Sequence, residues 1–167
     1  HSGIIALKLK DNDTLEWVKL STGNDDIMLI SINGQAIRFK ESTIRAMGRT
    51  ASGVRGISLR KDDAVSSFNI INPENKNKYT MLVVMANGFA KFTPLSEYKI
   101  QGRGGRGILT AKITPKTGHL VSSHVILEEL ELLAISVKGQ ILRTEIKGIR
   151  KTGRSAQGVR IMRLREG

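Results

Sequence analysis

The 167-residue sequence contains no cysteine, only three prolines and few aromatic residues. Without cysteine there is no disulfide framework, no thiolate zinc site and no cysteine nucleophile, and the chain fits the cytoplasm. Aromatic residues make up 4% of the chain, which disfavours proteins that bind single strands by stacking bases on Tyr, Phe or Trp. No apolar run reaches 18 residues, and the N-terminus has no signal-peptide pattern, so we expect neither a membrane span nor a secretory signal. The length still suits a domain with a buried core.

Positive charge is abundant instead. The chain carries 27 Lys and Arg against 15 Asp and Glu, a formal net charge of +12. A chain this basic usually binds a polyanion, most often nucleic acid or an anionic membrane. The charge is concentrated in residues 38–61, 91–116 and 138–165, with net charges of +6, +5 and +8, so the rest of the chain is net −7. Ordinary surface solvation mixes the two signs, and we therefore expect a basic stripe.

A glycine pattern repeats three times along the chain, with periods of 54 and 51 residues. In each copy a glycine follows Asn or Lys, a second glycine comes fourteen residues later before arginine, and a third follows after five more. The three glycines are Gly34, Gly48 and Gly53; then Gly88, Gly102 and Gly107; then Gly139, Gly153 and Gly158. Residues 3–7 match the phase of residues 53–57, so the chain starts and ends at one phase of the repeat and resembles an arc cut from a longer array.

Each repeat has the pattern of β-structure. An apolar run ends at an Asn-Gly or Lys-Gly pair and a second run follows, which predicts a hairpin with a two-residue primed turn and positive φ. The paired runs are Ile27–Ile32 with Ala36–Phe39, Met81–Ala86 with Phe89–Phe92, and Leu132–Val137 with Ile141–Arg143. Further strands are expected at Val54–Leu59, Ala64–Ile70, Ile108–Ile113 and Leu120–Ile126. Residues 127–133 (LEELELL) have helical propensity, but the repeat aligns them with a loop that enters a strand.

About four strands in some 50 residues match the size of a propeller blade. The sequence therefore predicts an all-β fold, a propeller-like array of four-stranded blades that forms a single domain over residues 1–167. We expect about three repeats and a partial one, with blades at residues 1–20 (partial), 21–72, 73–127 and 128–167 (partial).

Basic residues recur at fixed offsets around the second glycine: Arg45, Lys99 and Arg150 before it, and Arg49, Arg103 and Arg154 after it. Arginine makes planar, multi-donor contacts with phosphate oxygens, and the third glycine lets the backbone approach DNA closely. Such contacts position DNA without reading its sequence and depend strongly on salt. We therefore expect that replacing Arg49, Arg103 and Arg154 by Ala weakens DNA binding. The predicted DNA-binding residues are Arg38, Lys40, Arg45, Arg49, Arg55, Lys91, Lys99, Arg103, Arg106, Lys112, Arg143, Lys147, Arg150, Lys151, Arg154 and Arg160.

Residues 45–56 (RAMGRTASGVRG) closely resemble the blade motif of the C-terminal domain of DNA gyrase A, and the resemblance covers essentially the whole chain. The family implies a β-pinwheel whose neighbouring blades exchange strands, with a basic perimeter that bends and wraps duplex DNA to support negative supercoiling. It implies an accessory domain without catalysis of its own, since the cleaving tyrosine and the ATPase of this type IIA topoisomerase lie elsewhere. No cofactor is expected in this chain, and ATP and Mg belong to the full enzyme. The implied partners are double-stranded DNA, the rest of gyrase A, and gyrase B, with no membrane, in the bacterial cytoplasm at the nucleoid.

The heptapeptide Gln101-Gly102-Arg103-Gly104-Gly105-Arg106-Gly107 resembles the gyrase box of that family. Gly102 departs from the pattern, because the family has Arg or Lys there. The box belongs to the family's first blade, whereas a full repeat precedes this heptapeptide. Two interpretations stay open: a functional box, or a degenerate copy in a later blade.

Other functions remain as alternatives. The related domain of topoisomerase IV ranks second. A propeller that docks an acidic protein or an anionic membrane is an alternative of a different class. Competition by duplex DNA for the bound partner distinguishes this docking function from DNA binding. The Gly102-x-Gly104-x-x-Gly107 spacing matches a dinucleotide fingerprint, but that motif needs a following helix where we expect a strand. His119 and His124 lack acidic or Cys partners at metal spacing, so no metal site is predicted.

Overall fold

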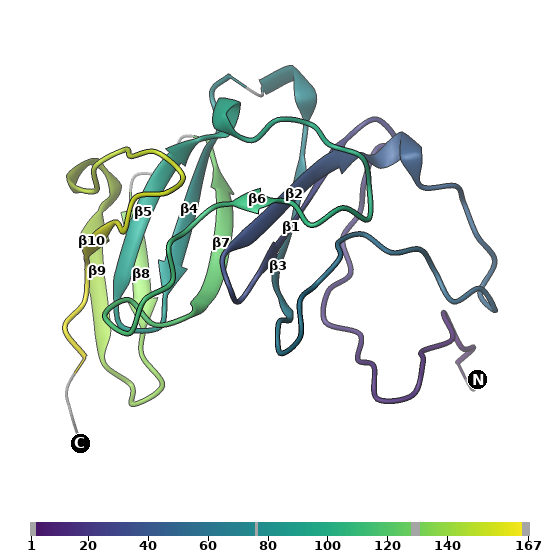
Figure 1. Ribbon diagram of the computed structural model, residues 1–167, viewed down its shortest axis with the longest axis horizontal. Coiled ribbons are helices and arrows are strands. Elements are labelled where there is room, and N and C mark those ends of the chain that lie inside the picture. The colour runs from purple at the N-terminus through teal and green to yellow at the C-terminus, as the bar shows by residue number, and fades with distance from the viewer. Residues whose placement is uncertain (1–2, 76, 128–130, 165–167) are drawn as a thin grey trace.

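The computed structural model describes residues 3–75, 77–127 and 131–164 (Figure 1). The regular elements of these residues are β-strands and single 3₁₀ turns, without an α-helix, which confirms the all-β prediction. Two four-stranded sheets stand side by side, a two-stranded hairpin lies at the C-terminal end, and the N-terminal segment runs along the opposite end without a strand. Residues 127–133 were predicted to be a loop that enters a strand, and residues 128–130 of this segment lie outside the described residues.

Each repeat contributes one hairpin, and all three hairpins lie where the apolar runs predict them. The strand pairs are β1 (Asp26–Ser31) with β2 (Gln35–Lys40), β4 (Thr80–Met85) with β5 (Phe89–Pro94), and β8 (Glu131–Ile135) with β9 (Ile141–Glu145). Two longer strands follow the hairpins, β3 (Val65–Ile71) and β7 (Leu120–Ile126), and both were expected.

The turn type differs from the prediction. The amides of Gly34, Gly88 and Gly139 donate to the carbonyl oxygen three residues earlier, at 2.9–3.1 Å. The three glycines have φ between 75° and 80°, but the residues before them do not have positive φ. The loops therefore contain three residues, a turn followed by a left-handed glycine, and not the two-residue primed turn. Positive φ in the turn was predicted correctly, but only the glycine has it, and not the residue before the glycine.

Neighbouring repeats share their sheets. The strand orders are β3-β1-β2-β6 and β10-β5-β4-β7, where β6 (Ile108–Leu109) and β10 (Val159–Arg160) come from the following repeat. The inner strands β3 and β7 pack against each other, and Asn69 donates to the hydroxyl of Ser123 at 3.1 Å. An exchanged strand thus closes the outer edge of each four-stranded sheet.

Of the predicted strands, one is absent and another is shorter than expected. Residues 54–59 form no strand, because their backbone bonds to a loop: the amide of Ser58 donates to Gly105 and the amide of Gly104 donates to Gly56, both at 2.8 Å. Strand β6 stops at Leu109, since the amide of Thr110 turns to the carbonyl of Gly34 at 2.8 Å. The exchanged strand is short because the neighbouring hairpin ends there.

The core is divided among the repeats. A central cluster of Met, Ile, Val, Leu and aromatic side chains joins the two large sheets, with Met28, Ile71, Met81 and Tyr98 at most 1% exposed. A second cluster lies between the second sheet and the C-terminal hairpin, and a third lies against the outer part of the first sheet. Each repeat therefore packs on its neighbours only, as in other repeat proteins.

Two buried cations tie each sheet to the next repeat. The Nη2 of Arg38 lies 2.6 Å from the carboxylate of Asp26, and its Nη1 donates to the carbonyls of Leu95 (3.4 Å) and Tyr98 (3.2 Å). Lys91 is fully buried, and its Nζ donates to the carbonyls of Gly153 and Arg154.

Burial lowers the pKa of Lys91 to about 8; Glu97 opposes the shift and Arg154 adds to it. Arg38 is 5% exposed and Lys91 is 0% exposed, so these two members of the predicted DNA-binding set lie in the interior. The physical reason is that each satisfies backbone carbonyls of the following repeat.

The Arg38–Asp26 pair has an exposed counterpart, which provides a matched test. Replacing Asp26 by Ala leaves a buried guanidinium without its counter-charge, and we expect a loss of about 3–5 kcal/mol in the free energy of unfolding. Glu131→Ala breaks the Arg143–Glu131 pair, which has the same 2.6 Å distance but side chains that are 72% and 46% exposed. This control is expected to cost less than about 1 kcal/mol. Urea unfolding measures both, and equal losses would contradict the role of burial.

Lys91 gives the fold a pH dependence at alkaline pH. Because its pKa is about 8 in the folded chain, the unfolded chain binds more protons between pH 8 and about 10.4. The free energy of unfolding therefore rises with pH in that range, relative to a Lys91→Met variant. We expect the difference in free energy of unfolding between the parent chain and Lys91→Met to grow in favour of the parent from pH 7.5 to pH 10. Urea unfolding at several pH values measures this difference, and a constant or shrinking difference would refute the assignment.

Candidate nucleic-acid interface

Exposed cations recur on three loops with the same local structure. Each loop follows a 3₁₀ turn: η1 (Glu41–Thr43), η3 (Leu95–Glu97) or η4 (Ile146–Gly148). The residue after each turn donates its amide to the first residue of the turn, at 2.8–3.0 Å, and the chain then bends away from the hairpin. We call residues 45–53, 99–107 and 150–158 the Gly-Arg loops. Their first residues, Arg45, Lys99 and Arg150, are exposed.

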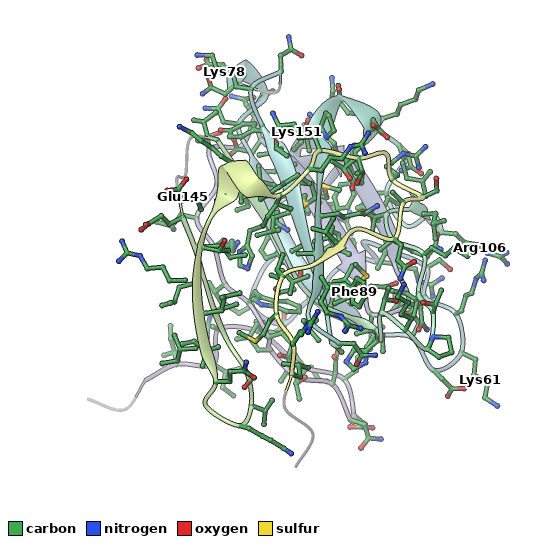
Figure 2. All side chains as sticks on the ribbon, turned by 90° about the vertical axis from the view of Figure 1, so that its left-hand side faces the viewer. Lys61, Lys78, Phe89, Arg106, Glu145 and Lys151 are labelled. Atoms are coloured by element: carbon green, nitrogen blue, oxygen red, sulfur yellow. The ribbon has the colours of Figure 1, made fainter. Side chains whose placement is uncertain are left out.

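Each later Gly-Arg loop lies across the outer edge of the preceding sheet. The amide of Gln101 donates to the carbonyl of Arg38, and the amide of Thr152 donates to the carbonyl of Phe92, both at 2.7 Å. The loops then continue into the exchanged strands β6 and β10. The strand orders place these edges opposite the inner strands β3 and β7. Figure 2 shows Arg106 extending from one side of the molecule and Glu145 lying towards the opposite side.

In the two later loops the third glycine serves this packing, whereas a Cβ at Gly53 would meet nothing within 4 Å. A Cβ at Gly107 would lie 2.4 Å from the carbonyl oxygen of Ala36, and a Cβ at Gly158 would lie 2.5 Å from that of Ala90. Both glycines also have positive φ, 74° and 85°. At Gly107 and Gly158 the close backbone approach is made to the neighbouring strand, and the predicted approach of the loop backbone to DNA stays a prediction.

The predicted DNA-binding residues separate into two groups in the structure. The first group is exposed, and the structure gives its side chains no hydrogen bond or ion pair within the described residues. It comprises Lys40, Arg45, Arg55, Lys99, Arg106, Lys112, Lys147, Arg150, Lys151 and Arg160. The second group has protein partners: Arg38 and Lys91 in the interior, Arg143 with Glu131, and Arg49, Arg103 and Arg154 with backbone carbonyls.

The gyrase-box-like heptapeptide contains members of both groups. Arg106 is exposed and free of polar partners in the described part of the chain, whereas Arg103 donates to the carbonyl of Arg55 at 2.7 Å. Gln101 is half-buried, and its side-chain nitrogen Nε2 has no hydrogen-bond partner among the described residues. Gly104 has φ 80°, and a Cβ at this position would lie 3.4 Å from the carbonyl oxygen of Arg55. Most of the heptapeptide therefore packs on the first repeat, and Arg106 alone offers a free cation to a ligand.

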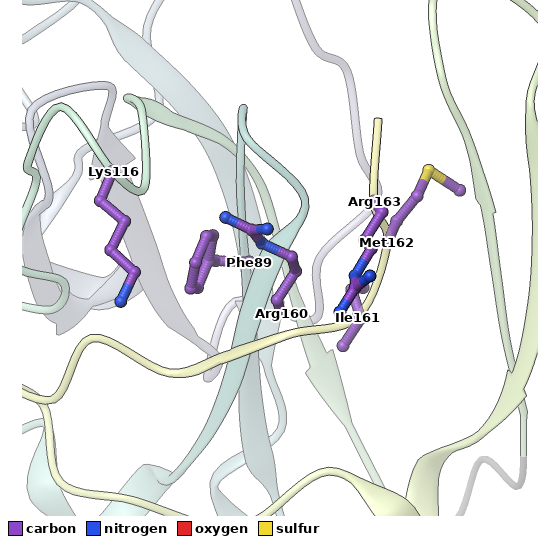
Figure 3. A pocket seen from close by; sticks show the side chains of 6 residues that line it. All are labelled: Phe89, Lys116, Arg160, Ile161, Met162 and Arg163. Atoms are coloured by element: carbon purple, nitrogen blue, oxygen red, sulfur yellow. The ribbon is translucent and has the colours of Figure 1, made fainter. Parts of the chain in front are cut away.

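An open pocket of about 530 Å³ collects three cations at the junction of the second and third repeats (Figure 3). Phe89 lies between Lys116 and Arg160, with 5.8 Å from its ring centroid to the Nζ of Lys116 and 5.0 Å to the Cζ of Arg160. Arg163 lines the same pocket, and none of the described residues that line it is acidic. Such cation–π contacts are worth about 0.5–1 kcal/mol at an exposed site, and they hold the two cations in place.

The sequence analysis missed Lys116, Arg163 and Phe89 as parts of this pocket. One signal was present, since Phe89 occupies the position after the turn glycine where the other repeats have Gln35 and Gln140. The pocket has the size and charge to accept a phosphate group.

The described residues offer little other chemistry. They hold no group of three or more His, Cys, Asp or Glu side chains placed to bind a metal ion. Burial lowers the pKa of His124, with Lys19 adding to the shift, so this imidazole is a poor cation at neutral pH. Within the same described ranges, no helix has the length and apolarity to cross a membrane.

Comparison with known proteins agrees with these features. A model of the family described as "DNA gyrase C-terminal domain, beta-propeller" matches residues 2–22, 25–72, 86–126 and 130–167. The DNA gyrase A protein of Staphylococcus epidermidis is 43% identical over 166 residues, and that of Mycobacterium tuberculosis H37Rv is 41% identical over 167 residues. Each alignment covers 99% of this chain but only 18% or 20% of the relative, so the chain spans about a fifth of the length of these proteins.

Solved structures show the same architecture. A DNA gyrase A C-terminal domain superposes with a TM-score of 0.86 at 26% identity, covering 98% of this chain and 55% of that one. The C-terminal domain of a DNA topoisomerase IV gives the same TM-score at 24% identity, covering 95% and 48%, which shows a shared fold. The exchanged strands, the repeated Gly-Arg loops and these matches together show that the chain belongs to the DNA gyrase C-terminal domain family, with a β-propeller-like fold.

Proposed function

We propose that the chain binds duplex DNA on the outer edges of its sheets, without sequence preference, and bends and wraps the duplex around them. The observation that carries the proposal is the set of exposed cations without polar partners in the described part of the chain, which recurs on the Gly-Arg loop of every repeat. Cations held close together without counter-charges repel one another, and the phosphates of a duplex relieve that repulsion. The pocket around Phe89 supplies one candidate phosphate site within this surface.

Wrapping must offset the stiffness of DNA. Smooth bending of a short site costs of the order of 1–6 kcal/mol. Many phosphate contacts, each releasing counterions, can supply this free energy. The contacts at the outer edges come from loops and exchanged strands, and not from base-reading helices. Such contacts fix the path of the duplex and carry no sequence information.

In the enzyme, the chain would act as an accessory domain of an ATP-dependent type IIA topoisomerase that introduces negative supercoils. Its partners would be duplex DNA, the rest of gyrase A, and gyrase B, in the bacterial cytoplasm at the nucleoid. DNA cleavage, ATP and Mg would belong to those other parts, and this chain would hold no cofactor. The topoisomerase IV domain shares the fold, but the gyrase relatives at 41–43% identity favour the gyrase role.

Salt dependence of DNA binding tests the interface. Replacing Arg106 or Arg160 by Ala removes one phosphate contact, so we expect weaker binding to all sequences. The slope of log K against log salt is negative, and its magnitude should fall by about 0.9 for each phosphate contact that is removed. Lys78→Ala is the matched control, because Lys78 is also exposed but lies just before β4, away from Arg106 (Figure 2). If Arg106→Ala and Lys78→Ala behave alike, the interface is wrongly placed. If an acidic protein or anionic vesicles bind and duplex DNA does not compete, the DNA function is wrong.

Chiral wrapping is a separate prediction. Nicked circular DNA ligated with the chain bound should show a shift in linking number after the protein is removed. The shift should grow with the amount of bound protein and disappear in high salt, because the wrap depends on phosphate contacts. Two-dimensional gel electrophoresis measures it. Binding without a shift would leave the interface in place but refute wrapping.

A further inference from the structure

Each Gly-Arg loop directs one arginine back to the repeat before it. The Nη1 atoms of the three arginines donate to backbone carbonyls: Arg49 to Ile5 at 3.1 Å, Arg103 to Arg55 at 2.7 Å, and Arg154 to Leu109 at 3.1 Å. The acceptors share one position in the repeat, two residues after a glycine, at Gly3, Gly53 and Gly107. A contact made three times at one position is a property of the repeat.

Arg103 and Arg154 are half-buried, whereas Arg49 is exposed. The Nε atoms of Arg103 and Arg154 are buried without a hydrogen-bond partner among the described residues. The Nε of Arg154 also lies 3.9 Å from the carboxylate of Glu97, which accepts the amide of Arg154 at 3.2 Å. Arg106, by contrast, is exposed and has no polar partner in the part of the chain that the structure describes.

The acceptor of Arg154 extends the connection over three repeats. Leu109 lies in the exchanged strand β6, where it pairs with Gln35 of the first repeat. Arg154 of the third repeat thus holds the strand that the second repeat places on the first. Arginine suits this task because its guanidinium stays charged and its rigid fork loses little freedom on binding, and bonds from charged donors are stronger than neutral ones.

We propose that Arg49, Arg103 and Arg154 are positioning residues that fix the angle between successive repeats, and that they are not phosphate contacts. The expectation that these three arginines contact DNA is thereby replaced. The positioning role does not depend on the proposed function. Only its effect on DNA rests on that function, because the angle between repeats would set the curvature of the DNA path.

The absence of cysteine allows a direct test on the chain itself. Ser42→Cys and Ser96→Cys introduce one spin label on η1 of the first repeat and one on η3 of the second, both at exposed positions. Pulsed dipolar spectroscopy then measures the distance distribution between the repeats. We expect Arg103→Ala to broaden the distribution and to lower the urea midpoint by about 0.5–1 M, and Arg103→Lys to give an intermediate distribution. Arg106→Ala, three residues further along the loop, should leave both quantities unchanged.

DNA binding separates the two roles. Arg103→Ala should keep the slope of log K against log salt of the parent chain, whereas Arg106→Ala should lower the magnitude of that slope by about 0.9. The proposal is overturned if Arg103→Ala lowers the magnitude of the slope and leaves the label distances unchanged. If Arg103→Ala does not fold, Arg103→Lys decides, and a distribution equal to that of the parent overturns the proposal. If the parent chain binds no duplex DNA, the proposed function fails, but the label distances still test the arginine.

Discussion

Cation-to-carbonyl bonds between successive repeats are the interaction on which the rest of the structure depends. At the first junction Arg38 reaches forward to the carbonyls of Leu95 and Tyr98, and Arg103 reaches back to the carbonyl of Arg55. At the second, Lys91 reaches forward and Arg154 reaches back. The loops that cross from one repeat to the next carry backbone carbonyls that no ladder satisfies, and buried carbonyls need donors. Long cationic side chains supply those donors across the junction.

The positive charge therefore serves two purposes that composition alone cannot distinguish. Some cations of the Gly-Arg loops, such as Arg103 and Arg154, bind backbone carbonyls at the junctions. Others on the same loops, such as Arg106, are exposed and have no polar partner in the described part of the chain. The two kinds are neighbours in sequence, as Arg103 and Arg106 are three residues apart in one loop. In the proposed function, a count of basic residues in the three windows therefore overstates the number of phosphate contacts, and the free, exposed cations set that number.

Local patterns predicted the hairpins well, because alternating apolar runs around a glycine turn depend on residues close in sequence. The exchange of β6 and β10 followed from the family resemblance only, since pairing with another repeat leaves no local trace. The burial of Arg38 and Lys91 was missed for the same reason: the carbonyls they satisfy lie 57 to 63 residues away. One signal was available, because Asp26 and Arg38 are twelve residues apart across the first hairpin, as Glu131 and Arg143 are across the third. The contact of Gly107 and Gly158 with the strand of the preceding repeat was missed because that strand is a neighbour in space and not in sequence.

In the proposed function, junction stiffness connects this architecture to DNA bending. In a repeat array each unit contacts only its neighbours, so the curvature of the whole is the sum of the junction angles. A bent duplex pushes back on the surface that holds it, and a soft junction would yield to that force by opening. The two junctions between the three hairpin repeats each resist opening in three ways: an exchanged strand, a forward cation and a backward arginine, all anchored on backbone. Backbone anchors restrict the angle more closely than surface ion pairs do, because surface pairs are weak and mobile. The same loop that offers Arg106 to a ligand is thus fastened by Arg103 to the preceding repeat, so force on the contact passes directly into the junction.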